Sequence, residues 1–355
     1  MPTYYRYASD DIVISTDKLA TSTWTNNVNN LQQAHTSSAQ AGDTASFQAF
    51  ASATSSGAFR IDVYNAATSS AASEIQYALA YGHRKGSGSL DFTNDTGSFG
   101  LSPSRAIYSQ YRNLVYGTEL TDFTFNTSTP EDIFVLNVQR SRYRQNLIAG
   151  TLNLTLKGDG TNANAKGSGI LKLTDDSITK TGSAVMTNAG RQFNLVSGSN
   201  GVMSGSKLQQ TAFGSYGLVY PDAGFIVFNA AAISASAGIV VNKGSNAGGK
   251  NHQAFFNAIS ASATANFVLD SEEKVTSQYY FTRIRNQEFN YTTNASFIEN
   301  DGTLSFSSMN DNPRVYITTI GLYNDSNELV AVAKLSQPLA KDFTKEALIK
   351  VKLDY

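Results

Sequence analysis

The stretch with the most chemical promise is GSNAGGKN, which ends at Asn251. Gly244, Gly249 and Lys250 have the spacing of a phosphate-binding loop, in which backbone N–H groups and a lysine hold a nucleotide's phosphates. The apolar segment GIVV precedes it, where the motif requires a strand. However, Asn251 stands where the motif needs a Ser or Thr hydroxyl for magnesium, and no apolar run ending in aspartate follows. We interpret the segment as a flexible loop and keep nucleotide binding through Lys250 as an enzymatic alternative.

The other residues that could do acid, base or metal chemistry are scattered. The three histidines lack neighbours at metal-ligand spacing, so we interpret them as surface or capping residues: His35, His83 and His252. The paired carboxylates lie in turn-like sequences, where aspartate bonds to the backbone: Asp10–Asp11, Asp175–Asp176 and the DSEE of 270–273. With no cysteine in the chain, thiolate chemistry is excluded. The sequence predicts no catalytic residue, no metal site and no cofactor.

One basic cluster remains, QRSRYRQN at 139–146. Arg140, Arg142 and Arg144 surround Tyr143, and in an extended chain the three arginines would share a face. Such a face could bind phosphate or a partner's carboxylates. The alternatives are a solvated strand end and a set of structural ion pairs, which are common outside functional sites. We name Arg140, Arg142, Tyr143 and Arg144 as candidate subunit-interface residues.

The composition limits which partners the chain can have. Of 355 residues 15% are charged, and 27 basic against 28 acidic residues give a formal net charge of -1. A neutral chain has no global field to attract nucleic acid or an anionic membrane, so we expect neither as a partner. The most apolar stretch, 225–241, is too short and too polar to span a membrane, and we expect it to be buried sheet followed by a small-residue connection.

The elements that must position these residues are mostly strands. Alternation or apolar runs predict strands at 59–65, 75–83, 133–138, 151–157, 169–174, 191–197, 216–221, 225–229 and 278–291. The best predicted helix is 102–117, because Ser102 can cap its first N–H groups, Pro103 suits the first helical position and Gly117 ends it. One face of this helix would pack against a sheet and contains Ile107, Tyr111, Leu114 and Val115. A second helical candidate is 251–269. The polar segment 16–57 buries little surface, so it either lies on a sheet or is ordered by a partner.

The C-terminal part holds a hairpin, 315–335, and a closing strand, ALIKVKLDY. In the closing strand Ala347, Ile349, Val351, Leu353 and Tyr355 alternate with charged residues. In the hairpin, apolar residues fall on both faces of both strands, which suits a strand pair covered on one side by its own core and on the other by something else.

The predicted fold class is mainly β, a two-lobed antiparallel β-sandwich architecture with one or two peripheral helices. We divide the chain into an N-terminal β-rich lobe, 1–100, and a main β-sandwich region, 101–355. The second region contains the helix near 103–116 and the C-terminal hairpin.

The last forty residues carry a resemblance. VYITTIGLYNDSNELVAVAKLSQPLAKDF resembles a segment of tail and baseplate proteins of tailed bacteriophages, in which IGLY, a turn, alternating aliphatics, a proline and a lysine occur in this order. The matching residues are Ile320, Gly321, Leu322, Tyr323, Asn324, Leu329, Ala331, Ala333, Pro338 and Lys341. Ser326 and Asn327 stand where the pattern often has glycine. A looser similarity to large structural proteins of T-even-like phages extends over 101–355.

The resemblance implies a non-enzymatic virion protein of a contractile tail, most like a baseplate wedge component. It implies assembly in the host cytoplasm, other tail and baseplate proteins as partners, and a homo-oligomer, a dimer, within the larger assembly. It adds Ile320, Leu322 and Tyr323 to the candidate subunit-interface residues. The alternatives are a receptor- or glycan-binding tail fibre or spike, suggested by Ser/Thr/Asn-rich loops and exposed aromatics, and another neck or tail structural protein.

Overall fold

The computed structural model describes residues 4–25, 35–36, 60–66, 69–88, 103–158, 170–179, 184–204, 213–243, 250–260, 267–291 and 294–355. The chain forms two compact units, of which unit 1 comprises Met1–Lys18 and Lys274–Tyr355 and unit 2 comprises Leu19–Glu273. The division predicted between residues 100 and 101 differs from this one. Strand β4 (Ile75–His83) pairs with β5 (Asp132–Val138) along seven residue pairs, so the chain on both sides of residue 100 belongs to one sheet.

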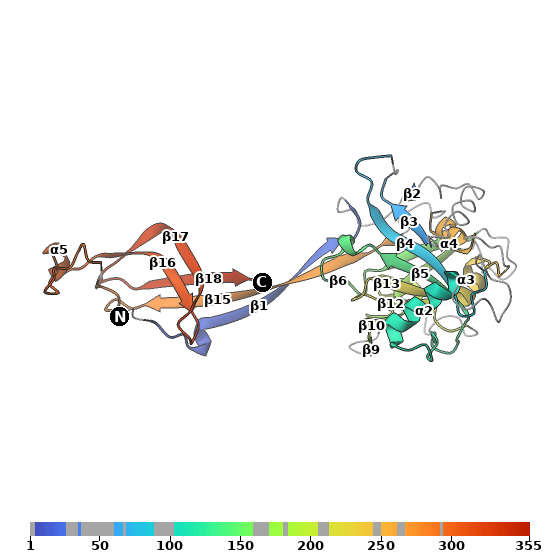
Figure 1. The fold of residues 1–355 in the computed structure, drawn as a ribbon, viewed down its shortest axis with the longest axis horizontal. Coiled ribbons are helices and arrows are strands. Elements are labelled where there is room, and N and C mark those ends of the chain that lie inside the picture. The colour runs from blue at the N-terminus through green and yellow to red at the C-terminus, as the bar shows by residue number, and fades with distance from the viewer. Residues whose placement is uncertain are drawn as a thin grey trace. The chain divides into compact units, whose positions relative to one another are not determined.

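Unit 2 is built around a 12-stranded antiparallel sheet (Figure 1). Its main path runs β14-β7-β8-β10-β12-β13-β5-β4-β3-β2, and β9 and β11 pair with β10. The strands not yet given are β2 (His35–Thr36), β3 (Arg60–Tyr64), β7 (Asn153–Lys157), β8 (Ile170–Asp175), β9 (Val185–Thr187), β10 (Gly190–Ser199), β11 (Val202–Met203), β12 (Gly217–Tyr220), β13 (Phe225–Asn229) and β14 (Phe267–Val268). The mainly-β class predicted from the sequence is confirmed.

The central strands of this sheet are buried on both faces. In β5, Phe134 and Leu136 pack into one hydrophobic cluster, whereas Ile133 and Val135 pack into another. Burial on both sides explains why β5 and β13 read as continuous apolar runs. The outer strands β7 and β8 instead bury alternate leucines and leave the other face wetter, as their alternation predicts.

In the described part of unit 2 the helices are α2 (Pro103–Tyr116), α3 (Ala230–Ala237) and α4 (Lys250–Ser260). Helix α2 follows the prediction closely and ends at Tyr116, directly before Gly117, whose φ is 69°. It packs so close to β4 that a Cβ added at Gly82 would lie 3.0 Å from the backbone nitrogen of Tyr108. Its buried face contains Tyr108, Tyr111 and Val115, whereas Leu114, predicted to be buried, is 47% exposed.

Three local predictions are wrong. The small-residue connection after β13 is helix α3, which Asn229 caps by accepting a hydrogen bond from Ala232 N at 3.2 Å. The helix predicted for 251–269 ends at Ser260, and Phe267–Val268 is strand β14. The DSEE segment is not a turn, because it begins the strand β15 (Asp270–Ile284).

Unit 1 contains much of a second sheet and a hairpin. The sheet has the order β1-β15-β18, in which β1 is Ile12–Ser22 and β18 is Ala347–Asp354, and β6 (Asn146–Leu147) also pairs with β15. The hairpin joins β16 (Val315–Tyr323) to β17 (Leu329–Lys341). Short helical turns are η1 (Ser9–Asp11), η4 (Arg140–Arg142, in unit 2) and α5 (Ser308–Asp311). Strand β18 alternates as predicted, although Tyr355 is 72% exposed.

Candidate subunit interface

The arginine segment is not extended, because Arg140–Arg142 form the 3-10 turn η4. The three arginines therefore meet different partners instead of sharing one face. Arg142 donates from Nη1 to Glu74 Oε2 at 2.8 Å and to Thr25 Oγ1 at 2.6 Å, and its side chain is 17% exposed. This guanidinium connects the segments that contain Thr25 and Glu74, which are distant in sequence, so it acts as a structural ion pair.

Arg140 and Tyr143 form a second contact group within the segment. Arg140 donates to the carbonyls of Tyr143 at 2.6 Å and Arg144 at 2.9 Å, and its guanidinium carbon lies 4.6 Å from the Tyr143 ring centroid. Tyr143 is buried and donates to Ala223 O at 3.2 Å, and burial raises the pKa of its hydroxyl. These bonds fix the segment to its own chain.

Arg144 has an exposed charge and few contacts within its own chain. Its side chain is 77% exposed, and its contact with Glu273 is long, at 4.0 Å. An exposed pair at that distance contributes about 0–1 kcal/mol. Arg144 is thus available to a partner, whereas Arg140, which is also exposed, already donates to two carbonyls of its own chain.

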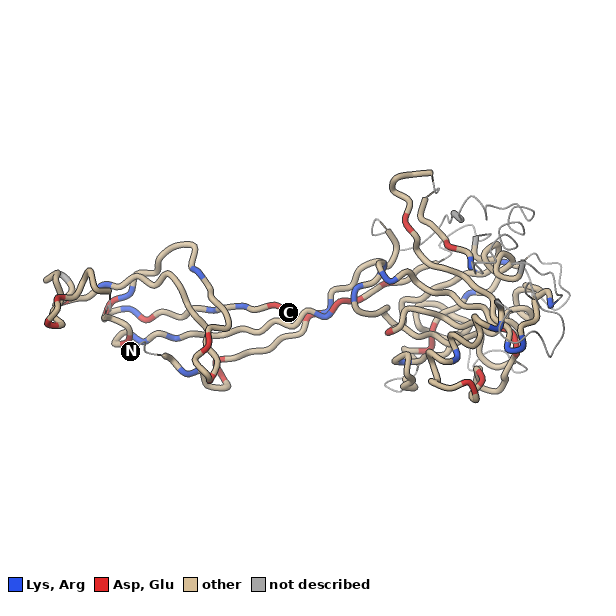
Figure 2. The backbone as a smooth tube through the Cα atoms, viewed as in Figure 1, with Lys and Arg blue, Asp and Glu red and all other residues tan. Residues whose placement is uncertain are grey.

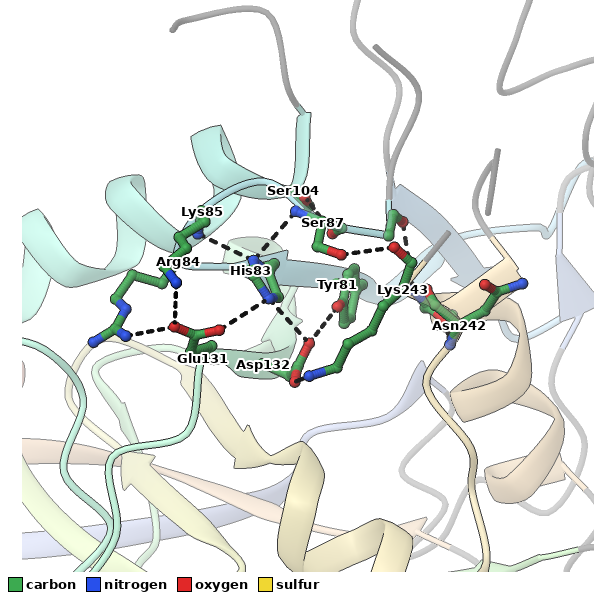
Figure 3. Close-up of polar contacts among 12 residues, drawn as sticks. Tyr81, His83, Arg84, Lys85, Ser87, Ser104, Glu131, Asp132, Asn242 and Lys243 are labelled. Carbon is green, nitrogen blue, oxygen red and sulfur yellow. Dashed lines mark hydrogen bonds and ion pairs between the residues drawn. The ribbon is translucent and has the colours of Figure 1, made fainter. Parts of the chain in front are cut away.

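A network of charged side chains in the described part of unit 2 lies at the start of the turn after β4 (Figure 3). Asp132 accepts from the Tyr81 hydroxyl at 2.5 Å and pairs with Lys243 Nζ at 2.7 Å. Glu131 pairs with Arg84 Nη2 at 2.6 Å and Lys85 Nζ at 3.2 Å, and these hydrogen bonds hold its pKa below the ordinary value. The carboxylates and the cationic side chains thus pair with one another within a single network.

His83 lies at the centre of this network and is oriented for structure. Its Nδ1 accepts the backbone N–H groups of Lys85 at 3.0 Å and Ser87 at 3.2 Å, while Nε2 faces Glu131 and Asp132, each at 3.7 Å. Burial, only partly offset by Asp132, lowers the pKa of His83. Protonation at Nδ1 would break both backbone bonds, so the ring caps the turn as a neutral side chain. The capping interpretation is confirmed, although the residue is buried.

The glycine-rich segment lies partly outside the described residues, which exclude 244–249. Gly238–Val241, which the phosphate-loop motif requires as a strand, is not a strand. Asn251 is buried and bonds with both backbone groups of Asn242, accepting from N at 2.7 Å and donating to O at 2.9 Å. The residue that replaces the motif's hydroxyl therefore ties the two ends of the segment together.

The paired aspartates also act on the backbone. Asp175 Oδ2 accepts from Gly150 N at 2.8 Å, and Asp176 Oδ1 accepts from Asn194 N at 2.9 Å. Both carboxylates are buried and hold turns, as their sequence setting predicts. Among the described residues, no three or more His, Asp or Glu side chains are grouped as a metal site.

The hairpin places its three candidate residues differently. Leu322 is 7% exposed and Ile320 is half-buried, so both belong to the inner face of the hairpin, whereas Tyr323 is 46% exposed on the opposite face. Leu322 and, in part, Ile320 are thus covered by their own chain. Tyr323 belongs to a surface.

Unit 1 as a whole has many exposed apolar side chains and few buried ones. Among the described residues, its buried hydrophobic side chains are Ile284, Leu322, Ala347 and Val351. Of the 27 exposed large apolar side chains among the described residues, seventeen lie in unit 1. Exposed apolar side chains that form one contiguous patch can be covered by another molecule, so those of unit 1 are candidates for such contact.

Comparisons with protein-family models, with curated proteins and with solved structures find no match in any of the three. Within the described part of the chain, no helix is both long and apolar enough to cross a membrane.

Proposed function

We propose that the chain is a non-enzymatic structural protein of a virion, a subunit of the contractile tail of a T-even-like phage, and within it a baseplate wedge component. Its role is to hold neighbouring tail subunits together through exposed surfaces. Assembly takes place in the host cytoplasm, and the finished protein resides in the tail. The IGLY segment and the residues that follow it support the phage assignment.

The observation that carries the structural role is the apolar surface of unit 1. Among its described residues, unit 1 buries four hydrophobic side chains and leaves seventeen large apolar side chains exposed, where other molecules can contact them. Subunits of a large assembly bury such surfaces against their neighbours. The charged groups of unit 2 fit the same role, because they bond to one another and fix loops.

The experiment is mass spectrometry of purified virions together with co-purification of a tagged chain from infected cells. The chain is expected among the tail proteins and in a complex with other baseplate components. Absence from virions, or recovery from infected cells with no tail protein attached, would sink the proposal. Placement of the chain in a map of the intact tail distinguishes the wedge from the neck.

A second candidate function is binding of a receptor or glycan. It is favoured by exposed aromatic side chains in one stretch of unit 1: Phe289, Tyr291, Phe297 and Phe306. Aromatic faces pack against the apolar faces of sugars, and the rings of Phe297 and Phe306 already lie 5.1 Å apart. Binding of the purified protein to host cells, lost in a Phe289→Ala, Phe297→Ala double variant, would favour this function over the first.

A further inference from the structure

Lys341 is a buried lysine at the end of strand β17 in unit 1. Only 1% of the residue is exposed. Its Nζ donates to three oxygens of one nearby segment, which are Asn286 O at 3.0 Å, Glu288 O, and Asn290 Oδ1 at 2.7 Å. Lysine is almost never buried to this extent in folded proteins, so the contact of this amine with a side-chain amide calls for a physical reason.

The amide carbon of Asn290 lies within reach of this amine. With Oδ1 at 2.7 Å from Nζ and a C=O bond of about 1.2 Å, Cγ is at most about 4 Å from Nζ. Atoms that are placed to react lie about 3–3.5 Å apart. The torsion that turns the plane of an asparagine amide is soft, so a small rotation brings the face of Cγ toward Nζ.

One backbone carbonyl binds the nitrogens of both side chains. Asn286 O accepts from Lys341 Nζ at 3.0 Å and from Asn290 Nδ2 at 2.7 Å. This oxygen therefore keeps the amine beside the nitrogen that an amide loses when another amine attacks its carbon. Burial lowers the pKa of Lys341 against the opposing charges of Glu288 and Asp342, so the neutral, nucleophilic form is easier to reach than in an exposed lysine.

The described part of unit 1 gains little stability from its charges or its core. Charged residues of both signs are spread along its strands (Figure 2), and the pairs Arg6–Asp325 and Arg283–Glu346 are exposed on both sides, so they contribute little. Its described residues bury four hydrophobic side chains, and the chain has no cysteine from which a disulfide could form. Small units with little buried apolar surface commonly rely on covalent cross-links.

We propose that Lys341 and Asn290 react to form an isopeptide bond, which cross-links the end of β17 to the segment after β15. Nζ, once it has lost one proton to solvent, forms a bond to Cγ of Asn290. The Cγ–Nδ2 bond then breaks, and a second hydrogen of Nζ leaves with Nδ2 as ammonia, so no oxidant, reductant or further reactant is needed. The two residues are 51 apart in sequence, and the bond removes loop-closure entropy from the unfolded chain, as a disulfide of that span does.

The test is mass spectrometry of the purified full chain under denaturing conditions. The unsubstituted chain is expected to be lighter than the mass calculated from its sequence by one ammonia molecule. A tryptic digest is expected to contain the peptide 335–345, uncut at the acylated Lys341, joined to the peptide 286–314. An unsubstituted chain of full calculated mass, with 286–314 recovered as a separate peptide, overturns the inference.

Variants assign the lost ammonia to this pair of residues. Lys341→Arg and Asn290→Ala are each expected to have the full mass calculated from their own sequences. Lys345→Arg is the matched control, because Lys345 is an exposed lysine near the same strand end, and it is expected to keep the ammonia deficit. A deficit that persists in Lys341→Arg, or a joined peptide that lacks Asn290, overturns the inference. The cross-link lies within one chain, so its absence would leave the proposed tail function standing.

Discussion

Acidification provides a sharp test of the core of unit 2, because it contains a histidine held neutral by burial. His252 lies on α4, is 5% exposed, and burial lowers its pKa from 6.5 to about 3. In the unfolded chain the ring regains its ordinary pKa, so below about pH 6.5 the unfolded state binds a proton that the folded state does not. The folded state therefore loses stability as pH falls through this window.

The magnitude follows from the two pKa values. Each pH unit between them changes the free energy of unfolding by about 1.4 kcal/mol, so lowering the pH from about 7 to about 5 removes about 2 kcal/mol through His252 alone. His83, whose pKa is also lowered by burial, adds to the loss in the same direction. His252→Gln removes the first contribution and leaves the second.

The assay is urea unfolding followed by the fluorescence of Trp24, the single tryptophan. Trp24 is buried in unit 2 and donates to Phe267 O at 2.9 Å, so it reports the unit that contains His252. The expected result is that the loss of stability between the two pH values is smaller in His252→Gln by about 2 kcal/mol. An identical pH dependence in the two proteins would show that His252 takes up its proton in the folded state, and the reasoning from burial would be wrong.

Three further predictions concern side chains that fix the fold. Gly224→Ala is expected to lower the free energy of unfolding by more than about 2 kcal/mol, because φ at Gly224 is 74° and the new Cβ would meet the Tyr143 ring. Gly302→Ala is expected to lower it by about 1 kcal/mol, because φ there is 86° but the space around the residue is open. Equal losses of the two variants in urea unfolding would contradict this. Arg142→Ala is expected to lower the free energy of unfolding by about 1.5–3 kcal/mol, whereas Arg144→Ala, at an exposed site, is expected to lower it by less than about 0.5 kcal/mol. A lower urea unfolding midpoint for Arg144→Ala than for Arg142→Ala would refute the structural role of Arg142. Lys341→Met removes an ammonium that donates to Asn286 O, Glu288 O and Asn290 Oδ1, and limited proteolysis should then cut near 286–290 sooner than in the exposed-lysine variant Lys345→Met.

The sequence predicts the sheet well where period and burial agree. Strands β5, β7, β8, β10, β12 and β13 lie within about two residues of their predicted ranges, because apolar runs and strict alternation have few alternatives. Helix α3 was missed since its alanines and serines have no amphipathic pattern. It forms because Asn229 caps one end and Gly238, with φ of 77°, ends the other.

Long-range pairing is what the sequence could not supply. The prediction for the arginine segment assumed an extended chain, but Arg142 finds Glu74, which lies 68 residues away, and the turn forms around that contact. His83 finds its backbone donors nearby, at Lys85 and Ser87, but its carboxylates come from Asp132, on the strand paired with its own, and from Glu131 just before that strand. Patterns within a segment determine which face is buried. They do not determine which distant charge arrives beside it.

The hairpin combines both lessons. Its alternation was enough to predict apolar residues on both faces, and the structure assigns the two faces unequal surroundings, with Leu322 7% exposed and Val330 67% exposed. Burying an exposed Val or Leu side chain stabilises by about 1.5–3 kcal/mol when it is complete. A strand that keeps such residues exposed forgoes that stabilisation until something covers them.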